Sequence, residues 1–203
     1  MLPLRIYGIA GVIRGGDEAR PERRNFLQKT TGHDPRELAR RSIQRYMELC
    51  DVPAVRFDRR ELASLFADHA VWQGVGDDNA AKFGRVVGPR AIVEMLERYL
   101  PPHDHFRLNM HLLDRGTMVI SDGKIEGDWT MMRLSTYGGG RSDLTASRLR
   151  VEFELHEGRA LISLYQPLRI WQQEIGDEVV DQMFGAFSGS TQTSGDRHGM
   201  GIP

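Results

Sequence analysis

Apolar side chains recur at helical spacing between about residue 34 and residue 100, and they alternate with polar ones over most of the chain that follows. Asp34, Pro35 and Glu37 together form a helix start signal, since Asp can cap the first turn and Pro suits the first helical position. Apolar residues then share one face as far as Asp51. We therefore expect the first helix over residues 34–51.

Two more helices are predicted before the long strands begin. A second capping pair, Asp58 and Glu61, opens a short helix. A third helix begins at Pro89, after a glycine, and is stopped by the prolines that start at Pro101. All three helices precede the main run of strands.

The remaining pattern has the two-residue period of half-buried strands, interrupted by Asp-Gly and Glu-Gly turns. Strands are expected over 69–76, 84–88, 105–113, 118–121, 124–137, 144–155 and 160–171. Helices followed by a run of antiparallel strands indicate an α+β fold and not a parallel α/β fold.

Composition places this fold in one domain with two tails. The chain has 203 residues, and both ends are rich in Gly, Arg, Ser or Thr with few large apolar side chains, which favours disorder. We expect a flexible extension over 1–32 and a folded domain over 33–175. After it we expect a segment over 176–203 that contains one or two helical turns at 177–184 and a disordered tail.

Charge and cysteine content exclude several classes of function. The 27 basic and 28 acidic residues nearly cancel, so nothing favours nucleic acid or an anionic membrane as a partner. A lone cysteine, Cys50, cannot form an internal disulfide, and the apolar start of the chain is too short to span a membrane. We expect a cytoplasmic protein.

Four strings resemble the SnoaL-like proteins of the nuclear transport factor 2 superfamily, which also includes scytalone dehydratase, bile-acid dehydratase, dehydrochlorinase and ketosteroid isomerase. They are YMELCD, ELASLFADHAVW, GRVVGPRAIVEMLERY and HFRLN, and the similarity extends over residues 34–173. The resemblance implies a cone in which a curved antiparallel sheet and three N-terminal helices enclose one small-molecule pocket. Fold alone does not specify the reaction.

The same resemblance implies a catalytic pair. Its dehydratase and dehydrochlorinase branches carry a carboxylate at the end of the first helix and a histidine at the start of a long strand, which match Asp51 and His105. The imidazole accepts a proton from carbon while the carboxylate orients it. Tyr46 matches a tyrosine that assists the leaving group, and Asp128 occupies the place of a second polar catalytic group.

Alternatives to this pair remain open. Asp58 could replace Asp51 as the acid, although its position as an N-cap explains it structurally. His103 could reach the same site or lie in the loop. A metal site using His103, Asp104, His105 and His111 lacks a typical zinc spacing, so we expect no metal and no cofactor.

Other side chains are expected either to contact the ligand or to lie at the surface. Asn109 shares the face of His105, and Trp72 and Trp129 are candidate pocket walls, although Trp129 and Asp128 point to opposite faces of their strand. Arg148 and Arg150 are expected at the surface, although one arginine inside the pocket could hold an anionic group.

The other face of the strand suggests an oligomer. It carries an apolar row that a monomer would expose, so we expect a homo-oligomer, a dimer or trimer. The residues of this row are Phe106, Leu108, Met110 and Leu112.

These expectations favour a cofactor-independent lyase or isomerase that acts by proton abstraction and elimination on a small apolar or aromatic molecule. The alternative is a non-catalytic ligand-binding or oligomerisation module of the same fold. The two are distinguished by whether a carboxylate and a histidine meet at hydrogen-bond distance inside a pocket.

Overall fold

The computed structural model describes residues 34–53, 57–176, 178 and 182. Its helices are α2 (Pro35–Cys50), α3 (Arg59–Ser64), α4 (Asp77–Phe83) and α5 (Pro89–Glu97). Its strands are β1 (Phe66–Gln73), β2 (Arg85–Val87), β3 (Phe106–Leu113), β4 (Thr117–Ser121), β5 (Lys124–Tyr137), β6 (Ser142–His156) and β7 (Arg159–Ile175).

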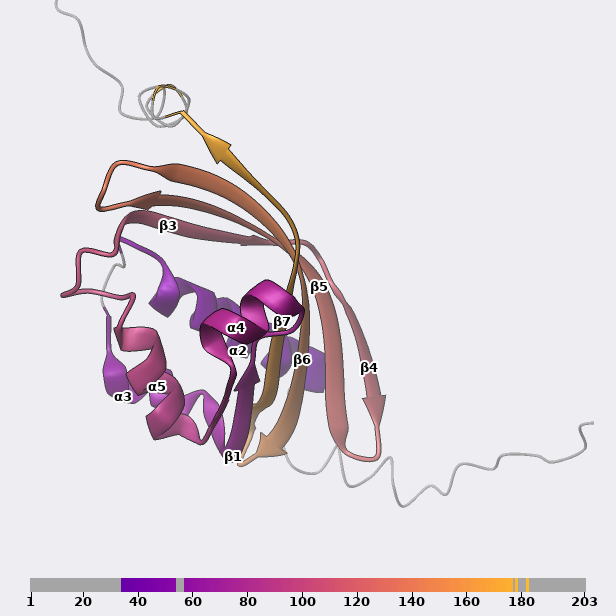
Figure 1. Cartoon of the computed structure of the whole chain (residues 1–203). Coiled ribbons are helices and arrows are strands. Elements are labelled where there is room, and N and C mark those ends of the chain that lie inside the picture. Colours follow the sequence, from indigo (N-terminus) through magenta and orange to yellow (C-terminus); the bar gives the residue numbers. More distant parts are fainter. Residues whose placement is uncertain (1–33, 54–56, 177, 179–181, 183–203) are drawn as a thin grey trace, which may run out of the picture.

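The seven strands form one curved sheet, and the helices lie on its concave side (Figure 1). The strand order is β2-β1-β7-β6-β5-β3, with β4 paired to β5. The predicted α+β class with a curved sheet and N-terminal helices is confirmed. One neighbouring pair, β1 and β7, runs parallel. The elements between these two strands supply the long connection that a parallel pair requires.

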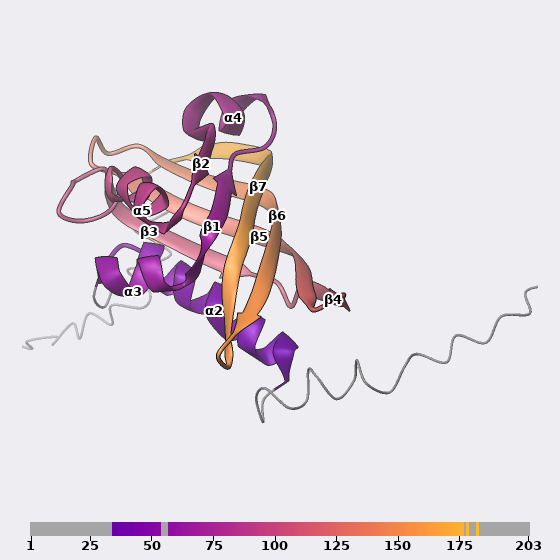
Figure 2. The same ribbon diagram turned by 90° about the horizontal axis from the view of Figure 1, so that it is seen from below.

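Helix α2 supplies much of the core because its apolar residues lie on one face. Asp34 caps this helix by accepting a hydrogen bond from the backbone N of Arg36 at 3.0 Å, and Pro35 occupies the first turn as predicted. Ile43 and Leu49 are fully buried, and the helix runs along the inside of the sheet in Figure 2. The end of α2 is thereby fixed against the strands that form the site.

Helix α4 was not predicted. Its sequence, DDNAAKF, has too few apolar residues to show helical spacing, and glycines flank it at Gly76 and Gly84. The helix is held over the open end of the sheet by Asn79, which donates a hydrogen bond to the carbonyl of Pro167, and by Phe83, whose ring lies 5.1 Å from that of Trp72. Tertiary contacts therefore account for this helix better than local propensity does.

A β-bulge changes the face pattern at the start of β3. Phe106 pairs with Tyr137 whereas Leu108 pairs with Thr136, so Arg107 is an extra residue between two adjacent pairings. Before the bulge the side chains point to the opposite face from the one that alternation predicts. Phe106 consequently packs against the core and does not belong to the outer apolar row, which corrects the expectation for that residue.

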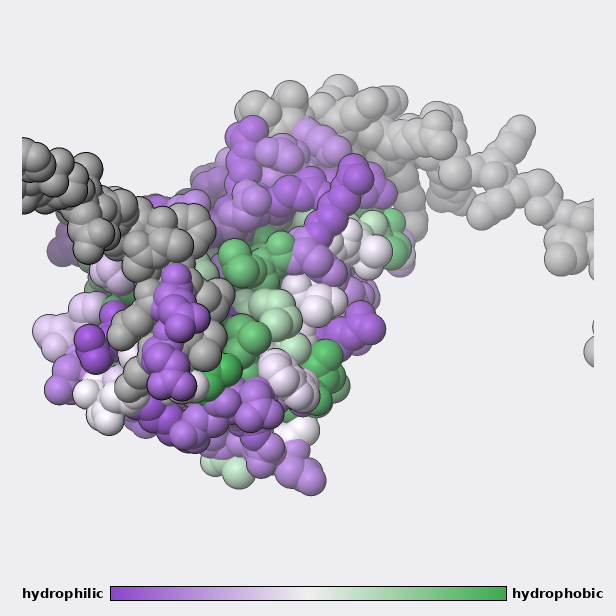
Figure 3. Space-filling model, turned by 90° about the horizontal axis from the view of Figure 1, so that it is seen from above, coloured by the Kyte–Doolittle hydropathy of each residue, from purple (hydrophilic) through white to green (hydrophobic). Residues whose placement is uncertain are grey.

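The outer face of the sheet still carries apolar side chains in register. Leu112 pairs with Met132, Met132 with Ala146, and Ala146 with Trp171, which gives one row across four strands. Leu112 is 57% exposed and Trp171 is 47% exposed. Figure 3 views this side of the molecule and shows apolar groups gathered between hydrophilic ones. Oligomerisation through this face stays a prediction.

Some predictions fall outside the described residues. The N-terminal extension at 1–32 and the C-terminal tail at 185–203 lie there, as does nearly all of the helical segment at 177–184. Among the residues that are described, none of the helices has the length and apolar character needed to cross a membrane.

Candidate functional site

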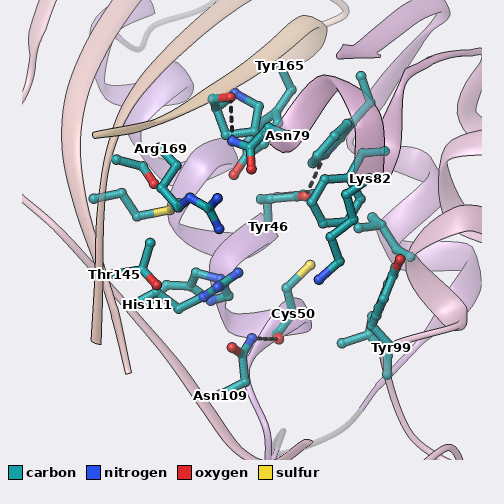
Figure 4. A pocket seen from close by; sticks show the side chains of 18 of the residues that line it. Tyr46, Cys50, Asn79, Lys82, Tyr99, Asn109, His111, Thr145, Tyr165 and Arg169 are labelled. Atoms are coloured by element: carbon teal, nitrogen blue, oxygen red, sulfur yellow. Dashed lines mark hydrogen bonds between the residues drawn. The ribbon is translucent and has the colours of Figure 1, made fainter. Parts of the chain in front are cut away.

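A cavity opens between α2, α4, α5 and the concave face of the sheet (Figure 4). Its empty volume is about 880 Å³, including the space at its mouth. The helices contribute Tyr46, Cys50, Asn79, Lys82, Phe83 and Leu96, and the segment after α5 contributes Tyr99 and Leu100. The strands contribute Trp72, Phe106, Asn109, His111, Met131, Arg133, Thr145, Ser147, Tyr165, Pro167 and Arg169.

Asp51 and His111 form a hydrogen-bonded pair at the wall of this cavity. The Asp51 carboxylate lies 2.8 Å from Nδ1 of the His111 ring and accepts a second hydrogen bond, at 3.0 Å, from the His111 backbone N. Val52 and Asn109 exchange two backbone hydrogen bonds, which attach the chain after α2 to β3 and bring Asp51 beside His111. The pair therefore depends on backbone pairing as well as on side-chain attraction.

His105 does not form the predicted pair with Asp51. It precedes the bulge, and its ring packs edge-on against Tyr99, Phe106 and Tyr137. Its buried Nε2 has no hydrogen-bond partner in the described part of the chain. Tyr99 and Phe106 line the cavity but His105 does not. The bulge explains the difference, because it shifts the face of every residue that precedes Arg107.

His111 is the histidine on β3 that does reach the cavity. It shares one strand face with Asn109, and that alternation was the signal in the sequence that could have identified it. Burial is the largest influence on the ring and lowers its pKa below 6.5, while the hydrogen bond to Asp51 partly opposes that effect. His111 is therefore neutral near pH 7, with Nδ1 bonded to Asp51 and Nε2 at the other edge of the ring.

Tyr46 lines the opposite wall of the cavity, and its assignment as a leaving-group residue stays a prediction. Its hydroxyl accepts a hydrogen bond from Nε1 of Trp72 at 3.1 Å, and its ring lies 4.7 Å from that of Tyr165. Burial raises the pKa of Tyr46 well above 10, raises that of Tyr165, and raises that of the Cys50 thiol to about 12. All three groups keep their protons at neutral pH.

Among the predicted ligand contacts, Trp72 and Asn109 line the cavity. Asn109 is buried, donates to the carbonyl of Cys50 at 3.1 Å and accepts from the hydroxyl of Ser135 at 2.9 Å. These bonds use its amide to hold the end of α2, so its role is to position the site.

Two predicted residues lie elsewhere. Asp128 is exposed on the outer face of β5 and is absent from the cavity lining. Trp129 is buried, and its ring covers Gly116 and Gly127, where an added Cβ would come within 2.3 Å and 2.2 Å of ring atoms. The two side chains point in opposite directions, as alternation requires, but the cavity lies further along the strand.

The alternative candidates also find structural positions. Asp58 caps α3 by accepting hydrogen bonds from the backbone N of Arg60 and Glu61, which agrees with the interpretation of Asp58 as an N-cap. His103 is exposed in the loop after α5. Within the described ranges, no group of three or more His, Cys, Asp or Glu residues is placed to hold a metal ion.

Comparison with known families identifies the domain that carries this cavity. Residues 35–165 match the model of the SnoaL-like domain. The chain belongs to the SnoaL-like family. Comparison with proteins of curated description gives no match.

Solved structures similar to this SnoaL-like domain have the same fold at low sequence identity. A putative scytalone dehydratase from Novosphingobium aromaticivorans is 13% identical, with 76% of this chain and 91% of that chain covered and a TM-score of 0.57. A type 2 hexachlorocyclohexane dehydrochlorinase is 20% identical, with 70% and 91% covered and a TM-score of 0.55. An NTF2-like protein with a cystatin-like fold, also from N. aromaticivorans, is 19% identical, with 77% and 92% covered and a TM-score of 0.53.

Three basic side chains that the sequence analysis did not identify also line the cavity of this SnoaL-like domain. Lys82 comes from α4, Arg133 from β5 and Arg169 from β7. Arg169 forms an ion pair with Asp78 on α4. Arg133 shares the inward face of β5 with Met131, and this face could not be identified from the pattern alone. Lys82 lies on the helix that was not predicted. Of the described residues that line the cavity, none is an Asp or a Glu.

Proposed function

We propose that this SnoaL-like domain is a cofactor-independent lyase or isomerase in which His111 removes a proton from a carbon atom of a small, largely apolar ligand. The observation that carries the proposal is the 2.8 Å hydrogen bond between Asp51 and Nδ1 of His111 at the wall of the cavity. This assignment keeps the predicted acid and replaces His105 as the base.

The pair has the properties of a general base. A carboxylate at Nδ1 holds the ring in the tautomer whose proton is on Nδ1, so the lone pair is on Nε2. Asp51 does not line the cavity and His111 does, so the ring edge that bears Nε2 is the one available to a ligand. The lowered pKa keeps His111 unprotonated at neutral pH. After proton transfer, Asp51 stabilises the imidazolium.

The opposite wall supports the negative charge that develops on the ligand. Tyr46 and Tyr165 remain protonated because burial raises the pKa of each. A hydroxyl of this kind can donate a hydrogen bond to an enolate oxygen or a leaving group in a site with little water. Trp72 donates to the hydroxyl oxygen of Tyr46, and this hydroxyl also lies within hydrogen-bonding reach of the Cys50 and Tyr165 side chains, so a ligand oxygen would join an existing group of donors.

The lining favours a ring-shaped ligand. The side chains of Trp72 and Tyr165 stack with centroids 5.5 Å apart, and the ring of Phe83 lies 5.1 Å from that of Trp72. Apolar walls with a few polar groups are typical of small-molecule sites. We infer an aromatic or other cyclic substrate.

Proton abstraction can be tested before the natural substrate is known, using nitrobenzisoxazole as a probe. Removal of its ring C–H proton by a base breaks the N–O bond and gives a coloured cyanophenolate, with no other reactant. We expect turnover above the buffer rate, a loss of about 10²-fold in His111→Gln, since general bases contribute 10²–10⁴, and a smaller loss in Asp51→Asn.

His105→Gln is the matched control, since it removes a neighbouring histidine that lies outside the cavity lining. Equal rates in wild type and His111→Gln would contradict the proposal. A loss confined to His105→Gln would restore the original pairing, and binding of the probe without turnover would favour the ligand-binding module.

A further inference from the structure

Arg133 is a charged side chain in the cavity lining, and no described residue forms an ion pair with it. Its Nε is buried without a hydrogen-bond partner, and no hydrogen bond or ion pair joins it to any other residue that the structure describes. Arg133 is half-buried, and a buried donor such as its Nε that lacks a partner costs free energy. An acceptor on a bound ligand would satisfy this donor.

Lys82 adds a second cation from the helix side of the same cavity. Its Nζ lies 5.1 Å from the ring centre of Phe83 and 5.2 Å from that of Tyr99. These aromatic faces direct the amine across the cavity from α4. Burial lowers the pKa of Lys82, and repulsion from Arg133 lowers it further. The two cations therefore repel each other across the cavity.

The nearest buried carboxylate does not cancel this charge. Asp143 attracts Lys82 at a distance, but its own oxygens accept hydrogen bonds from Tyr137 at 2.9 Å and Gln172 at 2.7 Å. It also lies 3.9 Å from Arg141 and does not line the cavity. Asp51 is likewise bonded to His111.

We propose that the ligand of this cavity is an organic carboxylate whose anionic group binds between Arg133 and Lys82. A planar guanidinium can hold a carboxylate through two parallel hydrogen bonds, and the lysine supplies a second charge. The aromatic wall at Trp72 then receives the ring of the same molecule. The inference rests on the proposed function only in placing the ligand in the same cavity, and it does not require turnover.

Naphthoate and its neutral analogue naphthamide differ in this group alone, so calorimetric titration with both isolates its contribution. We expect naphthoate to bind at least about tenfold more tightly than naphthamide, as charge-assisted hydrogen bonds favour. Arg133→Met should abolish the preference, and Lys82→Met should reduce it. Arg90→Met removes an exposed arginine from α5 and should leave the preference intact.

Stability of the ligand-free variants separates a binding role from a structural one. Because Arg133 is half-buried and its Nε has no partner among the described residues, Arg133→Met should leave the melting temperature unchanged or raised. A fall in melting temperature together with equal loss of both ligands would assign Arg133 to the fold and overturn the inference. So would equal binding of the two ligands to wild type, or no binding of naphthoate, benzoate or acetate at millimolar concentration.

Failure of the carboxylate site can be distinguished from failure of the proposed proton abstraction by His111. His111→Gln lacks the base but keeps both cations, so it should retain the preference for naphthoate. A retained preference with unchanged nitrobenzisoxazole turnover would reject His111 as the base and keep the carboxylate site. Loss of the preference in His111→Gln would place the anionic group at the histidine and overturn the inference.

Discussion

Replacing Asp51 by Ala removes two hydrogen bonds that hold the end of α2 to β3. One comes from the His111 backbone N at 3.0 Å and one from Nδ1 of its ring at 2.8 Å. Hydrogen bonds to a charged group contribute about 1.5–3 kcal/mol, and a backbone N–H left without a partner adds to the cost. The Asp51 side chain is 30% exposed, so water can replace part of the lost hydrogen bonding in the variant. We therefore expect the free energy of unfolding to fall by about 2–4 kcal/mol.

Thermal unfolding measures this loss. For a domain of this size, 1 kcal/mol corresponds to about 2–4 °C, so Asp51→Ala should melt roughly 5–15 °C below wild type. Asp114→Ala is the matched control, because Asp114 accepts one backbone hydrogen bond, from Gly116 at 3.0 Å, in an exposed turn. Its loss should be about 1 kcal/mol or less.

Asp51→Asn tests the electrostatic part separately. The amide oxygen can still accept from the His111 backbone, but the negative charge that raises the His111 pKa is gone. Titration of the imidazole by NMR should therefore give a lower His111 pKa in Asp51→Asn than in wild type. An unchanged pKa, or a melting temperature of Asp51→Ala no lower than that of Asp114→Ala, would refute the description of Asp51 and His111 as a coupled pair.

Three further outcomes are expected. Introducing Glu at Leu112 or at Trp171 should convert an oligomer to a monomer in sedimentation velocity, and a wild-type monomer at micromolar concentration would contradict the predicted oligomer. Deleting residues 1–32 and 185–203 should preserve cooperative unfolding, and loss of cooperativity would show that one tail completes the domain. Because the folded-state pKa of His111 lies below the ordinary 6.5, its contribution to stability should be full above pH 6.5 and lost as pH falls through the lowered value. His111→Gln should flatten that part of a denaturant-derived stability profile, and an unaltered profile would assign the dependence to other groups.

Much of the fold was predictable because local chemistry and tertiary structure agree. Asp34 and Asp58 cap the helices they were expected to cap, and the two-residue period marks β5, β6 and β7. Helix α4 was missed because its sequence carries no apolar stripe, and its position depends on contacts with Pro167 and Trp72 that lie far away in the chain.

The site was predictable only in part. Tyr46, Asp51, Trp72 and Asn109 lie in or beside the cavity, because a helix end and an inward strand face are visible in the pattern. The position of Arg133 in the cavity could not be predicted, because nearly every strand of this chain mixes charged and apolar residues. Charge alone therefore does not identify the inward face of a strand.

The extra residue at Arg107 has a consequence for comparing members of this family. When a histidine is assigned from its position in an alignment, the face of the strand on which it lies is assumed and not observed. One extra residue in the strand moves every side chain that precedes it to the other face, although its position in the alignment stays the same. In a chain with such an insertion, the imidazole that meets the acid is found by counting from the pairing of Asn109 with Val52, two residues onward, and not from the first histidine of the strand. A family member without a histidine at the column of His105 can therefore still carry the acid–histidine pair, two residues beyond its own equivalent of the Val52–Asn109 bridge.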